Sequence, residues 1–180
     1  LEGHFTWSPV LKRFFYSLMS GELISVGEDG SGERKHGSEF VSTFDISPDG
    51  ETVAFAAEGH NVELALMNLD GSNMTFVLDE TTRLQEGLMG KNFGYGPSWS
   101  PDGSRIAVNT SVSGGLMIID MASKSVLLPV QPPTWVMEPL SWSPDGRYLF
   151  VDQVNPSSNR RLRYIDLVDG SIITLPIEGY

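Results

Sequence analysis

The sequence contains no cysteine, few basic residues and no long hydrophobic run. The absence of cysteine excludes a disulfide framework, a thiolate nucleophile and a cysteine-based zinc site. The longest apolar runs, such as Leu116–Met121, have the length of a β-strand and are far shorter than a membrane span. The sequence therefore predicts neither thiol chemistry nor a membrane-spanning segment.

Basic residues number 12 against 23 acidic residues, which gives a formal net charge of −11. A negative field of this size repels phosphate backbones, so we do not expect nucleic-acid binding. The charge favours solubility or a basic partner instead. The sequence starts with Leu1 rather than methionine, so we expect a mature or excised piece, and the lack of a signal peptide indicates no compartment.

Residue patterns typical of catalysis are also missing. The histidines have no metal-ligand spacing, and the Gly-x-Ser-x-Gly motif of a hydrolase nucleophile does not occur. The glycine-rich stretch 87–96 fails the phosphate-binding pattern, because Asn92 stands where serine or threonine is needed. We therefore predict no catalytic residue, no cofactor and no metal ligand, and we interpret the protein as a non-enzyme.

One six-residue string is repeated along the chain. Ser-Trp-Ser-Pro-Asp-Gly occurs at 98–103 and 141–146, and the related Asp-Ile-Ser-Pro-Asp-Gly lies at 45–50. Together with the Ser-Pro pair at 8–9, these strings give spacings of 39, 53 and 43 residues. The longest spacing contains an insertion at 80–96. Removing part of it brings every unit close to the ~40–45 residues of a four-stranded propeller blade.

Each unit contains alternating or apolar segments of strand length, separated by glycine, asparagine, aspartate and serine. First strands are predicted at Phe5–Trp7, Phe44–Ile46, Pro97–Trp99 and Leu140–Trp142. Second strands are predicted at Arg13–Leu18, Thr52–Ala57, Arg105–Thr110 and Tyr148–Val154. Third strands are predicted at Glu22–Val26, Val62–Leu69, Leu116–Met121 and Leu162–Leu167. Fourth strands are predicted at Met74–Leu78, Ser125–Val130 and Ile172–Ile177.

These units predict an all-β, single-domain β-propeller over residues 1–180, with four blades of four antiparallel strands. The predicted blades span about 1–38, 39–80, 92–131 and 136–178, and 80–96 is predicted to be an inserted inter-blade loop.

The repeated Ser-Pro-Asp-Gly string has the residues of a tight turn between two strands. Proline presets φ, serine and aspartate bond to nearby backbone, and glycine accepts a left-handed conformation. We interpret Asp49, Asp102 and Asp145 as turn residues rather than catalytic or metal-binding carboxylates. Asp-Gly-Ser segments at 27–32 and 68–73 lack the acidic ladder of an EF-hand and leave calcium binding open.

The units resemble the TolB-like, WD40-like propeller repeat family, in which an apolar residue and Ser-Pro-Asp-Gly precede two strands, the second ending near aspartate. Trp99 through Asp120 and Trp142 through Asp166 match, Ile46 through Asn68 matches with two substitutions, and Trp7 through Val26 is degenerate. Similar repeats occur in periplasmic TolB proteins and in propellers of prolyl-oligopeptidase-type peptidases. The resemblance implies the fold and a periplasmic or extracytoplasmic location, but it says little about activity.

The chain departs from a closed propeller at its ends, because it starts at an inner strand and stops at an outer one. Nothing then remains to interlock the first and last blades, and each would expose an apolar face. We considered a fragment of a larger propeller, a small four-bladed ring and an association of two chains. We favour a fragment that self-associates through its terminal blades.

Antiparallel order places the Ser-Pro-Asp-Gly turns and the third-to-fourth turns at one end of the blades, which we call the turn face. The second-to-third loops and the inter-blade segments lie at the other end, the loop face. Cations and aromatic residues, which carry much of the energy of protein interfaces, gather on the loop face. The predicted partner-binding residues are Arg83, Lys91, Phe93, Tyr95, Trp135, Arg160 and Arg161.

Three functions fit this pattern. The leading hypothesis is a non-catalytic scaffold that binds a protein or peptide through the loop face. The first alternative is the propeller portion of a larger hydrolase whose catalytic domain lies outside this chain. The second is a carbohydrate or small-ligand binder that uses Trp135 and Tyr95.

Within 160–164, alternation predicts Arg161 and Arg163 on one side of a strand, and Leu162 and Tyr164 on the other.

Overall fold

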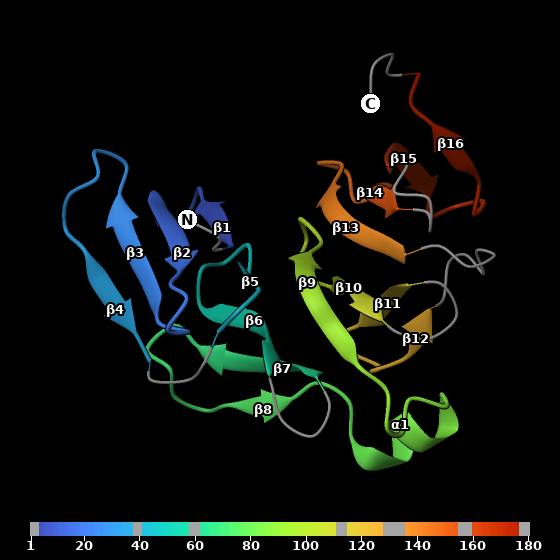
Figure 1. The fold of residues 1–180 in the computed structure, drawn as a ribbon, viewed down its shortest axis with the longest axis horizontal. Coiled ribbons are helices and arrows are strands. Elements are labelled where there is room, and N and C mark those ends of the chain that lie inside the picture. The colour runs from blue at the N-terminus through green and yellow to red at the C-terminus, as the bar shows by residue number, and fades with distance from the viewer. Residues whose placement is uncertain are drawn as a thin grey trace.

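A computed structural model of the protein describes residues 4–37, 41–57, 62–110, 115–127, 136–154 and 160–176. These residues form four antiparallel sheets of four strands each and one short helix. Within every sheet the strands lie in chain order, so each sheet is one blade with an inner first strand and an outer fourth strand (Figure 1). The predicted all-β fold of four four-stranded blades is confirmed.

The strands of the four blades have the following bounds. Blade 1 contains β1 (Phe5–Ser8), β2 (Arg13–Ser17), β3 (Leu23–Gly27) and β4 (Arg34–His36). Blade 2 contains β5 (Phe44–Ile46), β6 (Thr52–Ala57), β7 (Glu63–Asn68) and β8 (Thr75–Phe76). Blade 3 contains β9 (Phe93–Trp99), β10 (Arg105–Thr110), β11 (Leu116–Asp120) and β12 (Val126–Leu127). Blade 4 contains β13 (Val136–Trp142), β14 (Tyr148–Val154), β15 (Arg160–Asp166) and β16 (Ile172–Thr174).

The segment predicted as an inserted inter-blade loop at 80–96 joins blades 2 and 3 and contains regular structure. The segment begins with the helix α1 (Glu80–Gln85), and its last residues already belong to β9, which pairs with β10 as far as Phe93 opposite Thr110. The helix forms because the Asp79 side chain accepts a hydrogen bond from Thr82 N at 2.7 Å and so caps its first turn. The insertion therefore consists of a helix and a short connection.

The hydrophobic core lies between neighbouring blades, because alternation along each strand gives every blade two apolar faces. Phe15 of blade 1 shares a buried cluster with Phe44 and Phe55 of blade 2. Similar clusters join blade 2 to blade 3 and blade 3 to blade 4, the last one around Ala107 and Leu149. Each blade is thus stabilised mainly by the face of its neighbour.

The Ser-Pro-Asp-Gly turns are built alike in blades 2, 3 and 4. In blade 3, Gly103 N donates to Ser100 O at 2.9 Å, which closes the turn. Asp102 accepts from Ser100 Oγ at 2.6 Å and from Ser104 N at 3.0 Å, and Ser100 Oγ accepts from Arg105 N at 2.9 Å. The turns at Asp49 and Asp145 repeat these bonds. The predicted turn role of these aspartates is confirmed.

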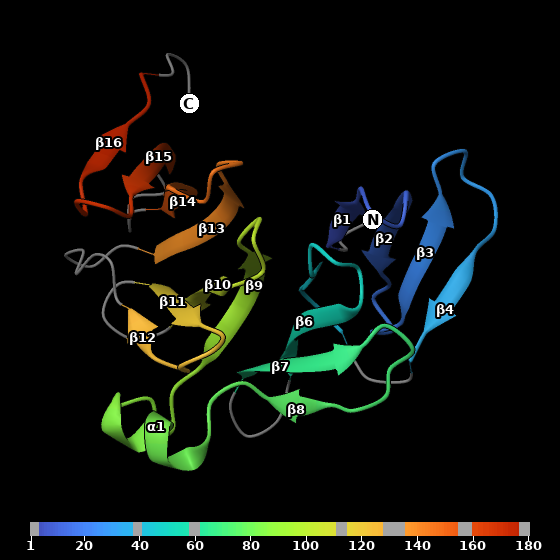
Figure 2. The ribbon, with the colours of Figure 1, turned by 180° about the vertical axis from the view of Figure 1, so that it is seen from behind.

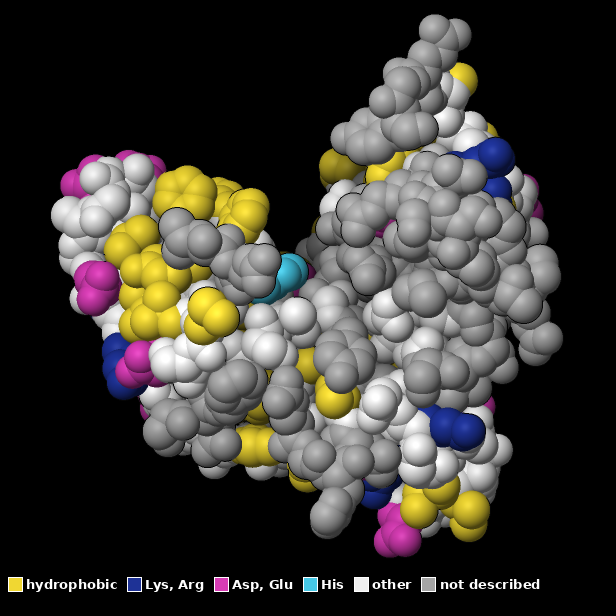
Figure 3. Space-filling view, in the orientation of Figure 1, with side chains coloured by type: hydrophobic (Ala, Val, Ile, Leu, Met, Phe, Trp, Pro, Cys, Tyr) yellow, Lys and Arg dark blue, Asp and Glu magenta, His cyan; other side chains and the backbone are white. Residues whose placement is uncertain are grey.

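The four blades form an open arc. Figures 1 and 2 show blade 1 and blade 4 on the two sides of a gap, and Figure 3 shows that the gap stays an open notch in the space-filling view. The inner strands β1, β5, β9 and β13 pack successively along the inside of the arc. The described residues therefore do not form the closed four-bladed ring that was one of three expectations.

Candidate partner-binding surface

Backbone hydrogen bonds establish which connections share each end of the blades. Leu69 N donates to Glu51 O at 3.1 Å, and Met121 N donates to Ser104 O at 2.8 Å. Each bond ties the end of a third strand to the Ser-Pro-Asp-Gly turn of the same blade. The turn face therefore has the predicted composition, and α1 lies at the opposite end, on the loop face (Figure 1).

The helix α1 is anchored to the blades by one ion pair and one buried side chain. Arg83, in its last turn, forms an ion pair with Glu63 at the start of β7, and both side chains are largely buried. Leu88 is fully enclosed in the cluster between blades 2 and 3, and its N donates to Arg83 O at 2.7 Å. These contacts fix a short helix that could not persist alone in water.

The same segment presents apolar side chains to solvent. Leu84 is 68% exposed and Met89 is 44% exposed, although Leu88 between them is buried. Lys91, two residues after Met89, is also exposed. Methionine is a residue type enriched at protein interfaces, whereas leucine and lysine are under-represented at their centres.

The two predicted cations of the insertion have different surroundings in the structure. Arg83 already pairs with Glu63 and serves the fold, whereas Lys91 is exposed and available to a partner. Leu84 and Met89 were not among the predicted site residues. The sequence did not single them out, because it does not show which of the nearby apolar residues is buried against the blades.

Of the remaining predicted residues, only Arg161 has a side chain within the described part of the structure. Phe93 and Tyr95 belong to the inner strand β9, and Arg160 starts β15, but their side chains lie outside the described part of the structure. Trp135 also lies outside it. Arg161 is exposed on β15. In that strand Arg163 pairs with Val151 and Tyr164 with Phe150, so the predicted alternation across 160–164 is confirmed.

A cavity of about 310 Å³ lies at the inner strands, where the blades converge. Beside it, the carboxylate of Asp45 joins three blades: it accepts from Thr6 Oγ1 at 3.3 Å, from Ile46 N at 2.9 Å and from Trp99 N at 2.8 Å. Burial raises the pKa of Asp45 to about 6 against the opposing effect of these hydrogen bonds. The lining residues are His4, Phe5, Thr6, Asp45, Gly96, Pro97, Ser98, Trp99, Pro101, Ser141 and Trp142.

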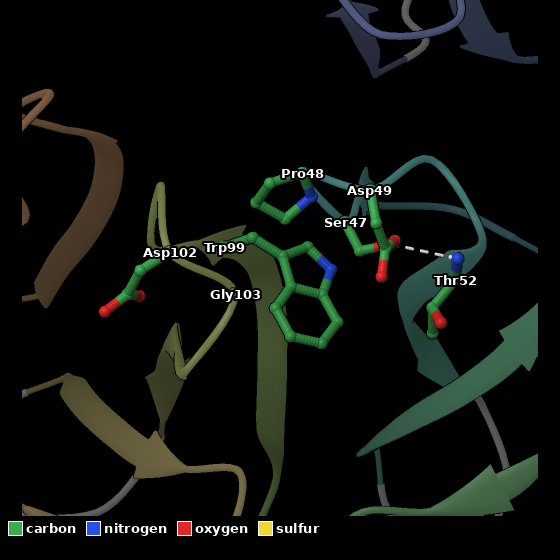
Figure 4. A pocket seen from close by; sticks show the side chains of 7 residues that line it. All are labelled: Ser47, Pro48, Asp49, Thr52, Trp99, Asp102 and Gly103. Carbon is green, nitrogen blue, oxygen red and sulfur yellow. Dashed lines mark hydrogen bonds between the residues drawn. The ribbon is translucent and has the colours of Figure 1, made fainter.

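A second cavity, of about 390 Å³, lies on the turn face between blades 2 and 3. Figure 4 shows the Trp99 ring between Pro48 and Thr52, with the Asp102 side chain pointing away from the ring. Hydrogen bonds within the turns, chiefly from Ser47 and Ser100, hold the pKa of Asp49 below its ordinary value and lower that of Asp102 to about 2. Both carboxylates are therefore committed to their own turns and do not form an acid–base pair.

The two described histidines have structural surroundings. His36 bridges blades 1 and 2, because its Nε2 lies 2.7 Å from Ser25 Oγ and its Nδ1 lies 3.0 Å from Leu69 O. His4 makes an edge contact with Phe44. Over the described ranges, no three histidine, aspartate or glutamate side chains lie close enough to hold a metal ion. Within the same ranges, no helix is long and apolar enough to cross a membrane.

Similarity to known proteins is found among solved structures. The sequence matches no protein-family model and no curated protein. A TolB structure from Agrobacterium tumefaciens is similar with a TM-score of 0.76 at 17% identity, over 99% of this chain and 62% of that one. TolB from Acinetobacter baumannii is similar with a TM-score of 0.76 at 16% identity, over 97% and 43%.

An oligogalacturonate lyase in complex with manganese is similar with a TM-score of 0.64 at 16% identity, over 95% of this chain and 52% of that one. The chain thus spans less than two thirds of the length of these proteins. Likeness at such low identity shows the fold alone. The chain is a set of β-propeller blades, and its repeats have the TolB-like fold.

Proposed function

We propose that the protein is a non-catalytic scaffold that binds a protein or peptide partner through its loop face. The observation that carries this proposal is the insertion between blades 2 and 3, where Leu84 and Met89 are exposed on an anchored backbone next to Lys91. Neither exposed side chain contributes to the core. Full burial of such a side chain by a partner is worth about 1.5–3 kcal/mol.

The charge of Lys91 and the anchoring of α1 add specificity to this apolar contact. Since Arg83 is occupied by Glu63, Lys91 is the cation of the insertion that can meet a partner's carboxylate. An anchored helix loses little conformational entropy when it binds, which favours affinity. The sequence-based prediction adds Phe93, Tyr95, Trp135, Arg160 and Arg161 to the proposed surface.

The resemblance to periplasmic TolB repeats makes an extracytoplasmic location part of this proposal, which cell fractionation tests.

Two other functions remain alternatives. A hydrolase would carry its catalytic domain outside this chain. A carbohydrate or small-ligand binder is favoured by the inner cavity with Trp99 and Trp142 in its wall, since aromatic faces bind sugars and other ring compounds.

Site-specific photo-crosslinking in cells tests the proposed surface. We expect a photoreactive amino acid at Leu84 or Met89 to form a discrete adduct with another polypeptide, and Lys91→Glu to weaken that adduct several-fold. The matched control is the same probe at Val168, which is 77% exposed but lies on the turn face.

A second variant addresses the rest of the loop face. Trp135→Ala, Tyr95→Ala and Arg160→Ala, combined in one chain, are expected to reduce adduct formation further. The absence of a discrete adduct at both Leu84 and Met89, or equal adducts at Leu84 and Val168, would contradict the proposal. Binding of glycans at the inner cavity, read by a glycan array, would favour the ligand-binding alternative.

A further inference from the structure

The interface between blades 3 and 4 contains an arginine stacked on a tryptophan. Arg105 is the first residue of β10, and its guanidinium lies 4.9 Å from the centre of the Trp142 ring in the next blade. The same guanidinium donates to Gly146 O, in the Ser-Pro-Asp-Gly turn of that blade, at 2.9 Å. A cation over an indole face is attracted by the negative charge of the π-system. We call the position of this guanidinium the cation position of the interface.

Asp102 contributes negative charge to the same cation position. Hydrogen bonds from Ser100 and Ser104 are the main cause that lowers the pKa of Asp102 to about 2, and the charge of Arg105 acts in the same direction. The cation position between blades 3 and 4 therefore has three components, which are an indole face, a glycine carbonyl and an ionised carboxylate.

The interface between blades 2 and 3 has the same three components without an arginine. The corresponding residues are Trp99 for Trp142, Gly103 for Gly146 and Asp49 for Asp102. Thr52 begins β6 as Arg105 begins β10, so the unit of blade 2 departs from that of blade 3 at this residue. Trp99, Gly103, Asp49 and Thr52 all line the cavity of about 390 Å³ on the turn face. In Figure 4 the Trp99 ring lies between Asp49 on one side and Asp102 on the other.

The surroundings of the glycines show that no described side chain fills the cation position between blades 2 and 3. A Cβ atom added to Gly146 would lie 3.3 Å from Arg105 Nη2 and 4.0 Å from Pro101 Cδ. Among the described residues, a Cβ atom added to Gly103 would have only Pro48 Cδ within 4 Å, at 3.8 Å. Since Pro48 and Pro101 correspond in the repeat, the difference is the guanidinium. The cavity therefore lies where the neighbouring interface places the Arg105 side chain.

The interface between blades 1 and 2 lacks two of the three components. Ile46 stands in the place of the tryptophan, and Val10 stands in the place of the aspartate. Here the position is filled by apolar side chains, because a Cβ atom added to Gly50 would lie 2.9 Å from both Val10 Cγ1 and Leu11 Cγ. Apolar filling thus accompanies the loss of the indole and the carboxylate.

Arg13 shows where the guanidinium goes when these components are missing. It begins β2 as Arg105 begins β10, but Ile46 stands where the next blade would offer a tryptophan. The Arg13 guanidinium donates to Ser25 Oγ at 2.8 Å and to Ser25 O at 3.0 Å, within its own blade. A guanidinium in the cation position therefore goes together with the indole and the carboxylate, both of which are present between blades 2 and 3.

We propose that the cavity between blades 2 and 3 binds a guanidinium group over the Trp99 ring, from an arginine side chain of a partner polypeptide or from a small guanidinium compound. The group donates to Gly103 O as Arg105 donates to Gly146 O. Both hydrogen bonds of Asp49 within its turn go to Oδ1, so Oδ2 accepts from the ligand. The planar fork of five N–H donors suits an indole face with acceptors at its edge better than an ammonium does. The net charge of −11 attracts such a cation.

NMR titration of the chain with two probes tests the site. We expect a blocked Gly-Gly-Arg-Gly-Gly peptide and ethylguanidinium to give saturable shifts of the assigned Trp99 indole N–H resonance. Tighter binding of the peptide assigns the site to a polypeptide side chain, and tighter binding of ethylguanidinium assigns it to a small compound. The Trp142 indole is the internal control and is expected not to shift, because Arg105 already fills its cation position.

A neutral probe isolates the contribution of charge. The same peptide with citrulline in place of arginine has nearly the same shape and no positive charge. It is expected to bind about tenfold more weakly, because the ring and the carboxylate no longer attract it.

Two variants exchange the filled and the unfilled positions. Thr52→Arg supplies a guanidinium from the chain itself, so it is expected to abolish the Trp99 shift and to raise stability in urea. Arg105→Ala clears the position over Trp142, so the probes are expected to shift the Trp142 indole as well. Asp49→Asn is expected to weaken binding several-fold. Circular dichroism checks that each variant is folded.

Three results would overturn the proposal. A Trp99 indole that shows no saturable shift with either probe would exclude guanidinium binding. Equal binding of the citrulline and arginine peptides would show that the charge is not recognised. Undiminished binding to a folded Thr52→Arg chain would place the probe elsewhere. The first two results need no variant, and the titrations do not involve the loop face, so they are independent of the photo-crosslinks at Leu84.

Discussion

Lys12 has a left-handed backbone, with φ at 51°, in the turn between β1 and β2. The turns of the other blades place glycine in this conformation, as at Gly50, Gly103 and Gly146. The first unit lost the Asp-Gly pair, and its turn contains Val10 and Leu11 instead, which pack closely over Gly50 of blade 2. Blade 1 thus combines backbone strain with an additional apolar contact.

Lys12→Gly is expected to stabilise the protein by about 0.5–1 kcal/mol. Relief of the left-handed strain of roughly 1–2 kcal/mol is partly offset by the greater entropy of glycine in the unfolded chain, about 0.4–1 kcal/mol. Urea denaturation measures the change. Lys12→Ala is the matched control, because it removes the same side chain and keeps the strain. Equal stability of the two variants would refute this explanation.

At the scale of elements, the serine and the aspartate of the Ser-Pro-Asp-Gly turn form hydrogen bonds with each other and with the backbone of the turn. Its value to the blade is local, since Asp102 bonds only within residues 100–104. The repetition of the motif therefore reports blade architecture and phase. It carries no information about a partner or substrate.

Asp102→Ala is expected to lower the free energy of unfolding by about 1 kcal/mol, because Ser104 N and two serine hydroxyls lose their charged acceptor at an exposed site. Asp102→Asn keeps one acceptor oxygen and is expected to lose less. Thermal unfolding measures both. If the turn role is correct, neither variant changes the photo-crosslinks at Leu84; a lost crosslink in a folded Asp102→Ala chain would assign the turn a binding role.

At the scale of the whole molecule, polar bridges tie the blades together in addition to the apolar clusters. His36 connects Ser25 of blade 1 with Leu69 O of blade 2, and Asp45 connects blades 1, 2 and 3. Burial is the main cause that lowers the pKa of His36, and the charges of Arg13 and Arg34 act in the same direction. The neutral imidazole fits this site, with one nitrogen donating and the other accepting.

This depressed pKa predicts how stability depends on pH. The unfolded imidazole titrates near 6.5, above the folded pKa, so the unfolded chain binds more protons as the pH falls and the protein loses stability below about pH 6.5. Asp45 acts oppositely, because its raised pKa favours the folded state below about pH 6. The loss from His36 is at most about 1.4 kcal/mol per pH unit.

His36→Gln is expected to flatten the pH dependence of stability between pH 7 and pH 5 while keeping a donor and an acceptor in place. Urea denaturation across this range gives the slope. His4→Gln is expected to remove a second part of the slope, since burial also lowers the pKa of His4. An unchanged slope in the His36 variant would show that the bridge between blades 1 and 2 does not titrate.

Local patterns predicted most of the strands. The bounds of β6, β10 and β14 agree with the predicted second strands, because their alternating or apolar runs end at turn residues. The strand β4 was missed, since its residues Arg34–His36 are polar and only pairing with β3 reveals it. The helix α1 was missed because a six-residue helix depends on its cap and on the burial of Leu88, which lies outside it.

The candidate surface was less predictable than the fold. Counting cations on the loop face could not reveal that Arg83 pairs with Glu63, twenty residues earlier in the chain. It also could not distinguish the exposed Leu84 from the buried Leu88. Both distinctions depend on contacts between segments that are distant in sequence.

The sequence by itself determined the repeat, the phase of the blades and the chemistry of their turns, because turn formation and strand alternation are local properties of a few neighbouring residues. Only the tertiary structure decided which apolar residues are core and which are surface. Phe14 and Ile106 have equivalent places in their blades, yet one is exposed and the other is buried. The physical reason is that each blade completes its core with the face of a neighbour, and the presence of that neighbour is a property of the assembled arc.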